Sequence, residues 1–168
     1  VNNGMDIKLR KYWSLGKSTT ANDHSINDES QIRRLKELLL SSVEQQMISD
    51  VPLGVFLSGG IDSSMVASMM QSVSNKPIDT FSIGFNEKEY DESSYARSIS
   101  NYLNTHHHEL IVDSKMSLDV VTELPNIYDE PFADASGIPT YILAKMSRNN
   151  VTVSLSGDGA DELFGGYE

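Results

Sequence analysis

The sequence contains no cysteine among its 168 residues. This absence excludes disulfides, thiolate metal sites and a cysteine nucleophile. It also fits a reducing compartment, so we expect a cytoplasmic protein.

Long hydrophobic runs are also absent, and no run approaches the roughly 18 apolar residues that span a bilayer. The start, Val-Asn-Asn-Gly-Met-Asp, has no basic stretch leading into an apolar one, so it does not resemble a signal peptide. We therefore expect no contact with a membrane.

Basic residues are few: 13 Lys and Arg stand against 24 Asp and Glu, which gives a formal net charge of -11. A broad basic face for nucleic acid is excluded. A phosphate ligand would have to bind through local groups, namely backbone N–H groups, a helix N-terminus or a divalent cation.

The length suits one domain, and the hydrophobic fraction of 39% predicts a folded core. Residues 18–30 are polar and nearly free of large apolar side chains, which is typical of a linker. We therefore expect residues 1–28 to be the end of a preceding domain with its linker, and residues 29–168 to be the core.

Helical and strand-like patterns alternate along this core. They predict strands at 53–57, 78–85, 106–112 and 151–155, and helices at 29–49, after Gly60, from Asp91, and in stretches between Ser114 and Asn150. This alternation predicts an α/β fold with a Rossmann-like parallel sheet and helices on both faces. Ligands of such sheets bind beyond the carboxyl ends of the strands.

Two of these helices have an apolar stripe that predicts their buried faces. For the helix at 29–49 the stripe is Ile32, Leu35, Leu39, Val43 and Met47. For the helix that Asp91 can cap, it is Tyr95, Ile99, Tyr102 and Leu103.

The turn at 58–64, Ser-Gly-Gly-Ile-Asp-Ser-Ser, joins the first strand to a helix. Its glycines and N–H groups can surround an anion, and Asp62 then argues for a bridging Mg²⁺. It is neither a Walker A loop nor a Gly-x-Gly-x-x-Gly fingerprint. The alternative is a tight turn in which Asp62 or Ser63 caps the helix.

The turn at 156–162 follows the last predicted strand and contains three carboxylates, Asp158, Asp161 and Glu162. A solvated acidic loop is one interpretation. The other is that these acids face the first turn across the same sheet edge and hold Mg²⁺ with Asp62.

The first string resembles the pyrophosphate loop of the ATP-pyrophosphatase (PP-loop) superfamily, whose fold is adenine nucleotide α-hydrolase-like. The second, Ser-Gly-Asp-Gly-Ala-Asp-Glu-Leu-Phe-Gly-Gly-Tyr, resembles a motif of the asparagine synthase family, in the synthetase domain of its glutamine-hydrolysing members. Segments 49–52, 80–85 and 107–109 agree with this family, and the resemblance covers about Ser49 to Tyr167.

The resemblance implies a role for each matching position. Positions around the adenosine are Leu57, Ile83, Ser156 and Gly157. Positions of the pyrophosphate loop are Ser58, Gly59, Gly60, Asp62 and Ser63. Asp62 and Asp161 match the Mg²⁺ ligands, and Asp158 and Asp161 are the catalytic candidates. Asp158 stands where many members have the longer Glu, which places its reach in question.

The implied reaction consumes ATP and Mg²⁺. It adenylates aspartate to β-aspartyl-AMP, releases pyrophosphate and lets ammonia form asparagine. One alternative is a related amidotransferase or lactam synthetase that acts on another carboxylate, for example in a surface-polysaccharide pathway. Another is a non-catalytic nucleotide-binding fragment.

Family members also have an N-terminal glutaminase domain, which supplies the ammonia, and they continue past Tyr167. We therefore expect an excised core that is inactive alone, and a homodimer for the full-length protein.

Two further segments stay outside the predicted site. For His106, His107 and His108, a structural role in the third strand is favoured over a metal site. Residues 129–134 either bound the substrate pocket or form a loop and a helix cap.

Overall fold

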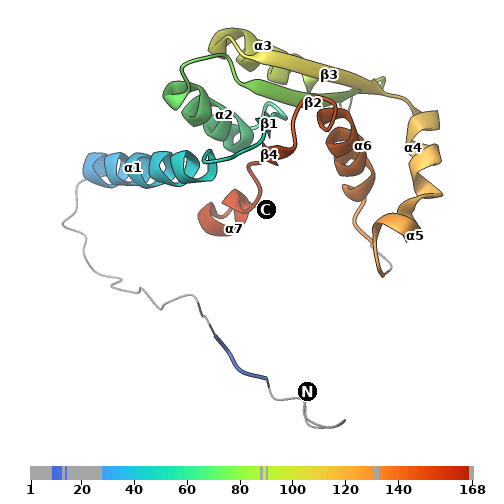
Figure 1. Ribbon diagram of the computed structural model, residues 1–168, viewed down its shortest axis with the longest axis horizontal. Coiled ribbons are helices and arrows are strands. Elements are labelled where there is room, and N and C mark those ends of the chain that lie inside the picture. The colour runs from blue at the N-terminus through green and yellow to red at the C-terminus, as the bar shows by residue number, and fades with distance from the viewer. Residues whose placement is uncertain are drawn as a thin grey trace. The chain divides into compact units, whose positions relative to one another are not determined.

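The protein is described by a computed structural model that covers residues 9–12, 14, 28–87, 89, 91–130 and 133–166 (Figure 1). It divides into two compact units, Val1–Lys36 and Glu37–Glu168. Helix α1 (Asp28–Gln46) begins in the first unit and ends in the second. The predicted linker lies, up to residue 27, outside the described residues, so the boundary at residue 28 stays a prediction.

The second unit contains a four-stranded parallel sheet with the order β3-β2-β1-β4. Helices and strands alternate as the sequence predicts. The elements that follow α1 are β1 (Leu53–Phe56), α2 (Ile61–Val73), β2 (Asp79–Phe85), α3 (Ser93–Leu103), β3 (His106–Val112), α4 (Ser114–Val121), α5 (Leu124–Ile127), α6 (Gly137–Ser147), β4 (Val153–Leu155) and α7 (Ala160–Phe164).

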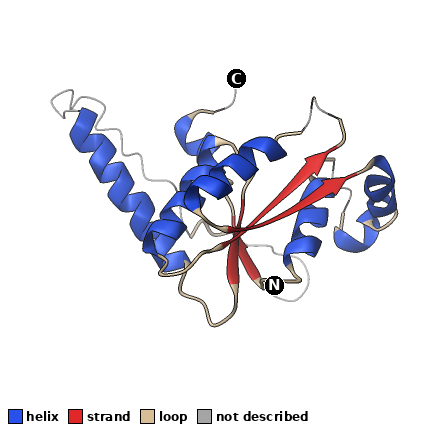
Figure 2. Cartoon of the chain, turned by 90° about the horizontal axis from the view of Figure 1, so that it is seen from above, coloured by secondary structure: helices blue, strands red, loops and turns tan. Residues whose placement is uncertain are grey.

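Helices cover both faces of the sheet (Figure 2). A separate hydrophobic core lies on each face. Helices α2 and α3 pack on one face around Val55, Met70 and Ala96. Helices α4 and α6 meet β2 and β3 around Val120 and Ile142. The predicted Rossmann-like α/β sheet with helices on both faces is therefore confirmed. No helix in the described ranges is both long and apolar enough to cross a membrane.

The fourth strand is shorter than predicted. Residues 151 and 152 precede it, although Val151 is buried. The amides of Thr152 and Val153 both donate to the carbonyl of Pro52. Regular pairing of β4 with β1 starts only at Val153, because one carbonyl is shared by two consecutive amides.

The predicted buried face of α3 is wrong at its two tyrosines. Tyr95 is 65% exposed and Tyr102 is 88% exposed, whereas Ala96 is fully buried. The residues that α3 buries are small, so the helix lies close to the sheet and leaves no room there for a tyrosine ring. Ile99 and Leu103 do pack against the core, as predicted.

The predicted stripe of α1 is buried only toward its end. Val43 is buried and Met47 packs on the same core. Ile32 is 66% exposed and Leu35 is 39% exposed, so these two positions of the predicted stripe are wrong. Both belong to the first unit, whereas Val43 belongs to the second.

His107 and His108 of β3 make side-chain contacts with β2, in line with the structural role expected for them. His107 bonds Thr80 through Nδ1 at 2.9 Å and Ser82 through Nε2 at 3.1 Å. His108 bonds Asp79 and stacks on Phe81. Burial lowers the pKa of His107 below 6.5, although Glu109 opposes this shift.

We expect substitutions in α3 to have different effects at its buried and at its exposed positions. Ala96→Leu places three extra carbons in a filled space and should cost about 1–3 kcal/mol of unfolding free energy. Tyr102→Leu, on the exposed side of the same helix, should stay within about 0.5 kcal/mol of wild type. Urea unfolding of both variants measures the difference, and equal losses would contradict the observed face.

The pKa of His107 also predicts how stability depends on pH. Because the folded pKa lies below the unfolded value of 6.5, the unfolded chain takes up the proton first as the pH falls. This group therefore costs stability below about pH 6.5 and has no effect above it. His107→Gln should lose less unfolding free energy than wild type between pH 7.5 and 5.5, and an identical slope in both would contradict the assignment.

Candidate functional site

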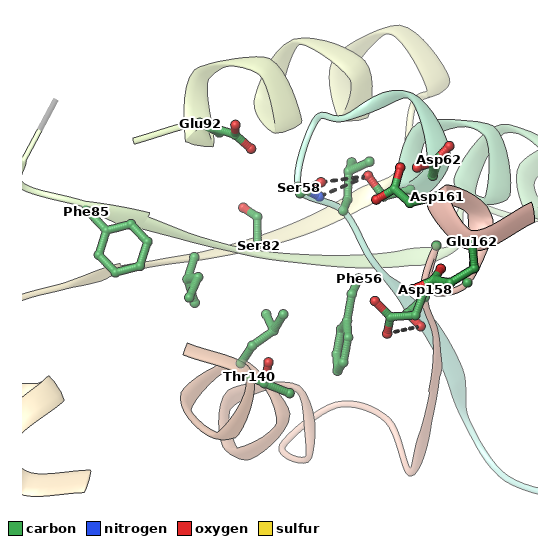
Figure 3. A pocket seen from close by; sticks show the side chains of 17 residues that line it. Phe56, Ser58, Asp62, Ser82, Phe85, Glu92, Thr140, Asp158, Asp161 and Glu162 are labelled. Atoms are coloured by element: carbon green, nitrogen blue, oxygen red, sulfur yellow. Dashed lines mark hydrogen bonds between the residues drawn. The ribbon is translucent and has the colours of Figure 1, made fainter. Parts of the chain in front are cut away.

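A cleft of about 480 Å³ opens at the carboxyl ends of the central strands. Its walls come from β1 and β2, from α6, and from the turns that follow β1 and β4 (Figure 3). The volume lies in the range of small-molecule sites. This is the edge at which a parallel sheet of this kind binds its ligands.

The turn after β1 is held together by its own hydroxyl groups. Ser63 Oγ lies 3.0 Å from Ser58 Oγ, and the Ser58 amide donates to Ser63 Oγ at 3.2 Å. Ser58 Oγ also accepts from the Gly60 amide. These bonds fix the path of the backbone as it enters α2.

Gly59 is the residue that this path requires. Its φ of +93° lies in the left-handed region, which favours glycine. A Cβ at this position would lie 2.6 Å from Tyr95 Cβ and 2.8 Å from the Ala96 amide nitrogen. The turn therefore lies directly against α3, and no larger residue fits.

The turn after β4, at 156–162, packs through Gly157 on the turn after β1, at 58–64. A Cβ on Gly157 would lie 2.8 Å from the Ser63 amide nitrogen and 3.0 Å from Asp62 Cβ. Beside it, Ser156 Oγ donates to the Asp158 carboxylate at 2.8 Å. The two turns that the sequence singles out thus touch each other backbone to backbone.

Three aspartates line the cleft: Asp62, Asp158 and Asp161. Asp62 lies in the first turn of α2 and Asp161 in the first turn of α7. Both helices begin after a glycine, without a hydrogen bond from a capping side chain. The alternative in which Asp62 or Ser63 caps α2 is therefore wrong. Figure 3 shows all three carboxylates in the same half of the cleft.

These carboxylates fit a metal ion only in one way. Within the described part of the chain, no group of three or more His, Asp or Glu side chains could hold an ion alone. Mg²⁺ at nucleotide sites uses one or two carboxylates together with phosphate oxygens and water. The donors present fit an ion shared with phosphates.

The structure brings most of the predicted site residues into this one cleft, while their roles stay predictions. Those that line it are Leu57, Ser58, Asp62, Ser63, Ile83, Ser156, Gly157, Asp158 and Asp161. Gly59 and Gly60 shape the turn between them without lining the cleft. The segment 129–134 contributes no lining residue among those described. There, Asp134 accepts from the Ser136 amide, which lowers the pKa of its carboxyl group.

Besides Phe56 at the end of β1, sequence reasoning missed four polar or aromatic residues of the cleft. Ser82 and Phe85 come from β2, Glu92 precedes α3, and Thr140 comes from α6. The position of β2 beside β1 was a usable signal, because its carboxyl end must lie at the same edge. Nothing in the sequence around Thr140 marks it.

Glu92 is held in place by its neighbour Asp91. The Asp91 carboxylate accepts from the Phe85 amide at 3.3 Å and from the Ser93 amide at 3.1 Å. Hydrogen bonds from Ser93 lower the pKa of Asp91. This carboxylate therefore joins the end of β2 to the start of α3 and fixes the chain around Glu92. The N-cap residue of α3 is Glu92, so the prediction that Asp91 caps this helix is wrong by one position, although Asp91 does accept from the Ser93 amide at the helix start.

The parallel sheet and the two adjoining turns at its edge define an α/β domain of the adenine nucleotide α-hydrolase-like type. Solved structures share the fold. They include an NH3-dependent NAD synthetase from Campylobacter jejuni, with a TM-score of 0.54 and 16% identity over 81% of this chain and 60% of that one. An NMN synthetase from Francisella tularensis gives a TM-score of 0.53 at 16% identity, over 85% and 59%.

The chain belongs to the asparagine synthase family, whose model, described as "Asparagine synthase", matches residues 34–168. It is 42% identical to a putative glutamine-hydrolyzing asparagine synthetase 2 of Methanocaldococcus jannaschii, over 96% of this chain and 31% of the relative. It is 38% identical to the glutamine-hydrolyzing asparagine synthetase 1 of Bacillus subtilis, over 96% of the chain and 25% of the relative. The chain thus spans between a quarter and a third of these relatives.

The two adjacent glycines of the first turn should respond differently to alanine. Gly59→Ala combines a left-handed φ with a clash against the α3 backbone, so it should destabilise by more than about 1 kcal/mol. Gly60→Ala meets only Ser58 Oγ at 3.4 Å and should stay within about 0.5 kcal/mol. Thermal unfolding compares them, and a harmless Gly59→Ala would contradict the described turn.

Proposed function

We propose that this chain is the nucleotide-binding core of a glutamine-dependent asparagine synthetase, and that it adenylates the side-chain carboxylate of aspartate. The observation that supports this most is the contact of Gly157 with Asp62 and Ser63. It unites a phosphate-type turn and an acidic turn in one cleft. A phosphate cradle next to carboxylates is what an ATP-cleaving site with a bridging cation needs.

In this proposal the first turn binds the β- and γ-phosphates of ATP. Ser58 and Ser63 donate hydroxyl groups, and the amides at the start of α2 face the anion. The adenosine lies against Leu57, Ile83, Ser156 and Gly157. The aspartate carboxylate attacks the α-phosphorus, the bond to the pyrophosphate oxygen breaks, and β-aspartyl-AMP forms. Ammonia then displaces AMP and gives asparagine.

Asp62 and Asp161 are the residues that would hold Mg²⁺, which neutralises charge on the departing pyrophosphate when it is bound. Asp158 has a different place, because its carboxylate accepts from Ser156. We propose that it orients the reacting groups from there as a catalytic residue. Asp158 lines the cleft although its side chain is one methylene shorter than that of Glu.

Aspartate is the acceptor that the names of the relatives favour, since both are asparagine synthetases. Their names also state glutamine hydrolysis, so we propose that ammonia comes from a glutaminase domain outside this chain. The chain has no cysteine for that step. Activation of another carboxylate would use the same cleft, and an assay with aspartate as the sole acceptor separates the two.

Asp62→Asn and Asp161→Asn should each lower adenylation strongly in the intact protein and raise the Mg²⁺ concentration that it needs. Neither side chain caps its helix, so the melting temperature should change little. The double variant should be little worse than either single one, because loss of one ligand already disables a shared ion. The readout is aspartate-dependent release of pyrophosphate as a function of Mg²⁺.

Asp119→Asn is the matched control, since it removes one exposed charge of α4 outside the cleft. It should keep both the wild-type rate and the wild-type Mg²⁺ dependence. Wild-type Mg²⁺ dependence in Asp62→Asn and Asp161→Asn would show that these carboxylates do not share an ion, and the metal assignment would fall.

A further inference from the structure

Ser82 lines the cleft but belongs to neither of the turns at 58–64 and 156–162. It is 2% exposed, its side chain comes from the middle of β2, and its hydroxyl is bonded to His107 Nε2 at 3.1 Å. Figure 3 shows this hydroxyl on the side of β2 where Glu92 lies, opposite the ring of Phe85. What Ser82 offers to a ligand depends on where its single proton points.

A chain of hydroxyl groups behind Ser82 decides the direction of that proton. Thr105 Oγ1 donates to Ser100 Oγ at 2.9 Å. Thr105 Oγ1 also lies 2.9 Å from Thr80 Oγ1. A hydroxyl has only one proton, and that of Thr105 is already used, so Thr80 donates to Thr105. Thr80 then has no proton left for its next partner.

That next partner is His107 Nδ1, at 2.9 Å from Thr80 Oγ1. Since Thr80 can only accept there, the imidazole proton is on Nδ1. The other ring nitrogen, Nε2, then has a lone pair and accepts from Ser82. Ser82 spends its proton on His107, so its oxygen faces the cleft as a hydrogen-bond acceptor.

The surroundings of His107 agree with a neutral ring. Burial lowers its pKa, and the ring lies between β2 hydroxyl groups. The charged or titratable groups near it are Glu109, with Oε2 3.8 Å from Nε2, Arg97 of α3, which is paired with Glu109 at 2.6 Å, and His108. Arg97 neutralises Glu109, the carboxylate near the ring that would favour a charged imidazole.

Glu92 adds a second acceptor to the same part of the cleft. Its side chain makes no capping hydrogen bond to α3, and its backbone is fixed through Asp91 and Ser93. A carboxylate here disfavours phosphate, which the turn at 58–64 binds in the proposed function. The remaining parts of a nucleotide that donate hydrogen bonds are the sugar hydroxyls and an exocyclic amine of the base.

We propose that Ser82 is a binding residue that accepts a hydrogen bond from an N–H or O–H donor of the bound nucleotide, with His107 as the positioning residue that fixes its proton. The donor is either the 6-amino group of adenine or a ribose hydroxyl. An amino group at this place would favour adenine over guanine, whose 6-oxygen is itself an acceptor. The inference rests on the proposed use of ATP.

The test is equilibrium binding of Mg²⁺-nucleotides to the intact protein by calorimetry. ATP is compared with purine riboside triphosphate, which lacks the amine, and with 2′-deoxy-ATP and 3′-deoxy-ATP, which each lack one hydroxyl. Ser82→Ala should weaken ATP about three- to tenfold, the size of one hydrogen bond. It should leave unchanged the affinity for the one analogue that lacks the donor in question.

Two further variants sharpen this comparison. Ser98→Ala removes an exposed hydroxyl of α3 and should keep all four wild-type affinities. His107→Phe keeps an aromatic ring but frees the Ser82 proton, so it should reduce the preference for ATP over the same analogue. Wild type itself should lose this preference at a pH low enough to charge His107, because Nε2 then donates to Ser82.

The outcomes distinguish failure of the proposed Ser82 contact from failure of the proposed function. If wild type binds ATP, and Ser82→Ala weakens ATP and all three analogues equally or none of them, then Ser82 makes no such contact and this inference is overturned while the proposed function stands. If wild type binds no Mg²⁺-ATP, both fall.

Discussion

The contact between Gly157 and the first turn of α2 is the constraint on which the cleft depends. Parallel pairing of β1 with β4 brings the two strand ends to the same level, and the turns that follow them then compete for the same space. A residue without a side chain at position 157 lets the two backbones meet at van der Waals distance. Because of this approach, Asp62 and Asp161 line one cleft although a hundred residues separate them in the sequence.

Much of this arrangement could be predicted from the sequence, because it depends on local signals. Strand-like segments of five to eight residues between helical stripes indicated each strand, and glycines marked the two turns. Their meeting followed from the rule that parallel strands end at one edge. The roles of individual side chains are a separate matter, since placement in a cleft does not assign chemistry.

What could not be predicted depends on packing between distant segments. The tyrosines of α3 are apolar enough to suggest a buried face, yet the tight approach of Gly59 leaves space there only for a small side chain such as that of Ala96. Ser82 has an ordinary place in a strand, and its importance arises from His107 on the neighbouring strand. Glu92 lines the cleft beside Asp91, whose carboxylate joins the end of β2 to the start of α3. None of these contacts produces a periodic pattern in the sequence.

The strands on the two sides of the sheet differ in the length over which they pair. Strands β2 and β3 pair over seven residues, whereas β1 and β4 pair over three. Local opening requires the loss of only the hydrogen bonds within the opening segment, so a short edge strand detaches at lower free energy than a long pair. Asp158 and Asp161, in the acidic half of the cleft, follow the shortest strand of the described sheet. The amides of β4 should therefore exchange their hydrogens faster than those of β2. A ligand that contacts both turns should slow the exchange in β4.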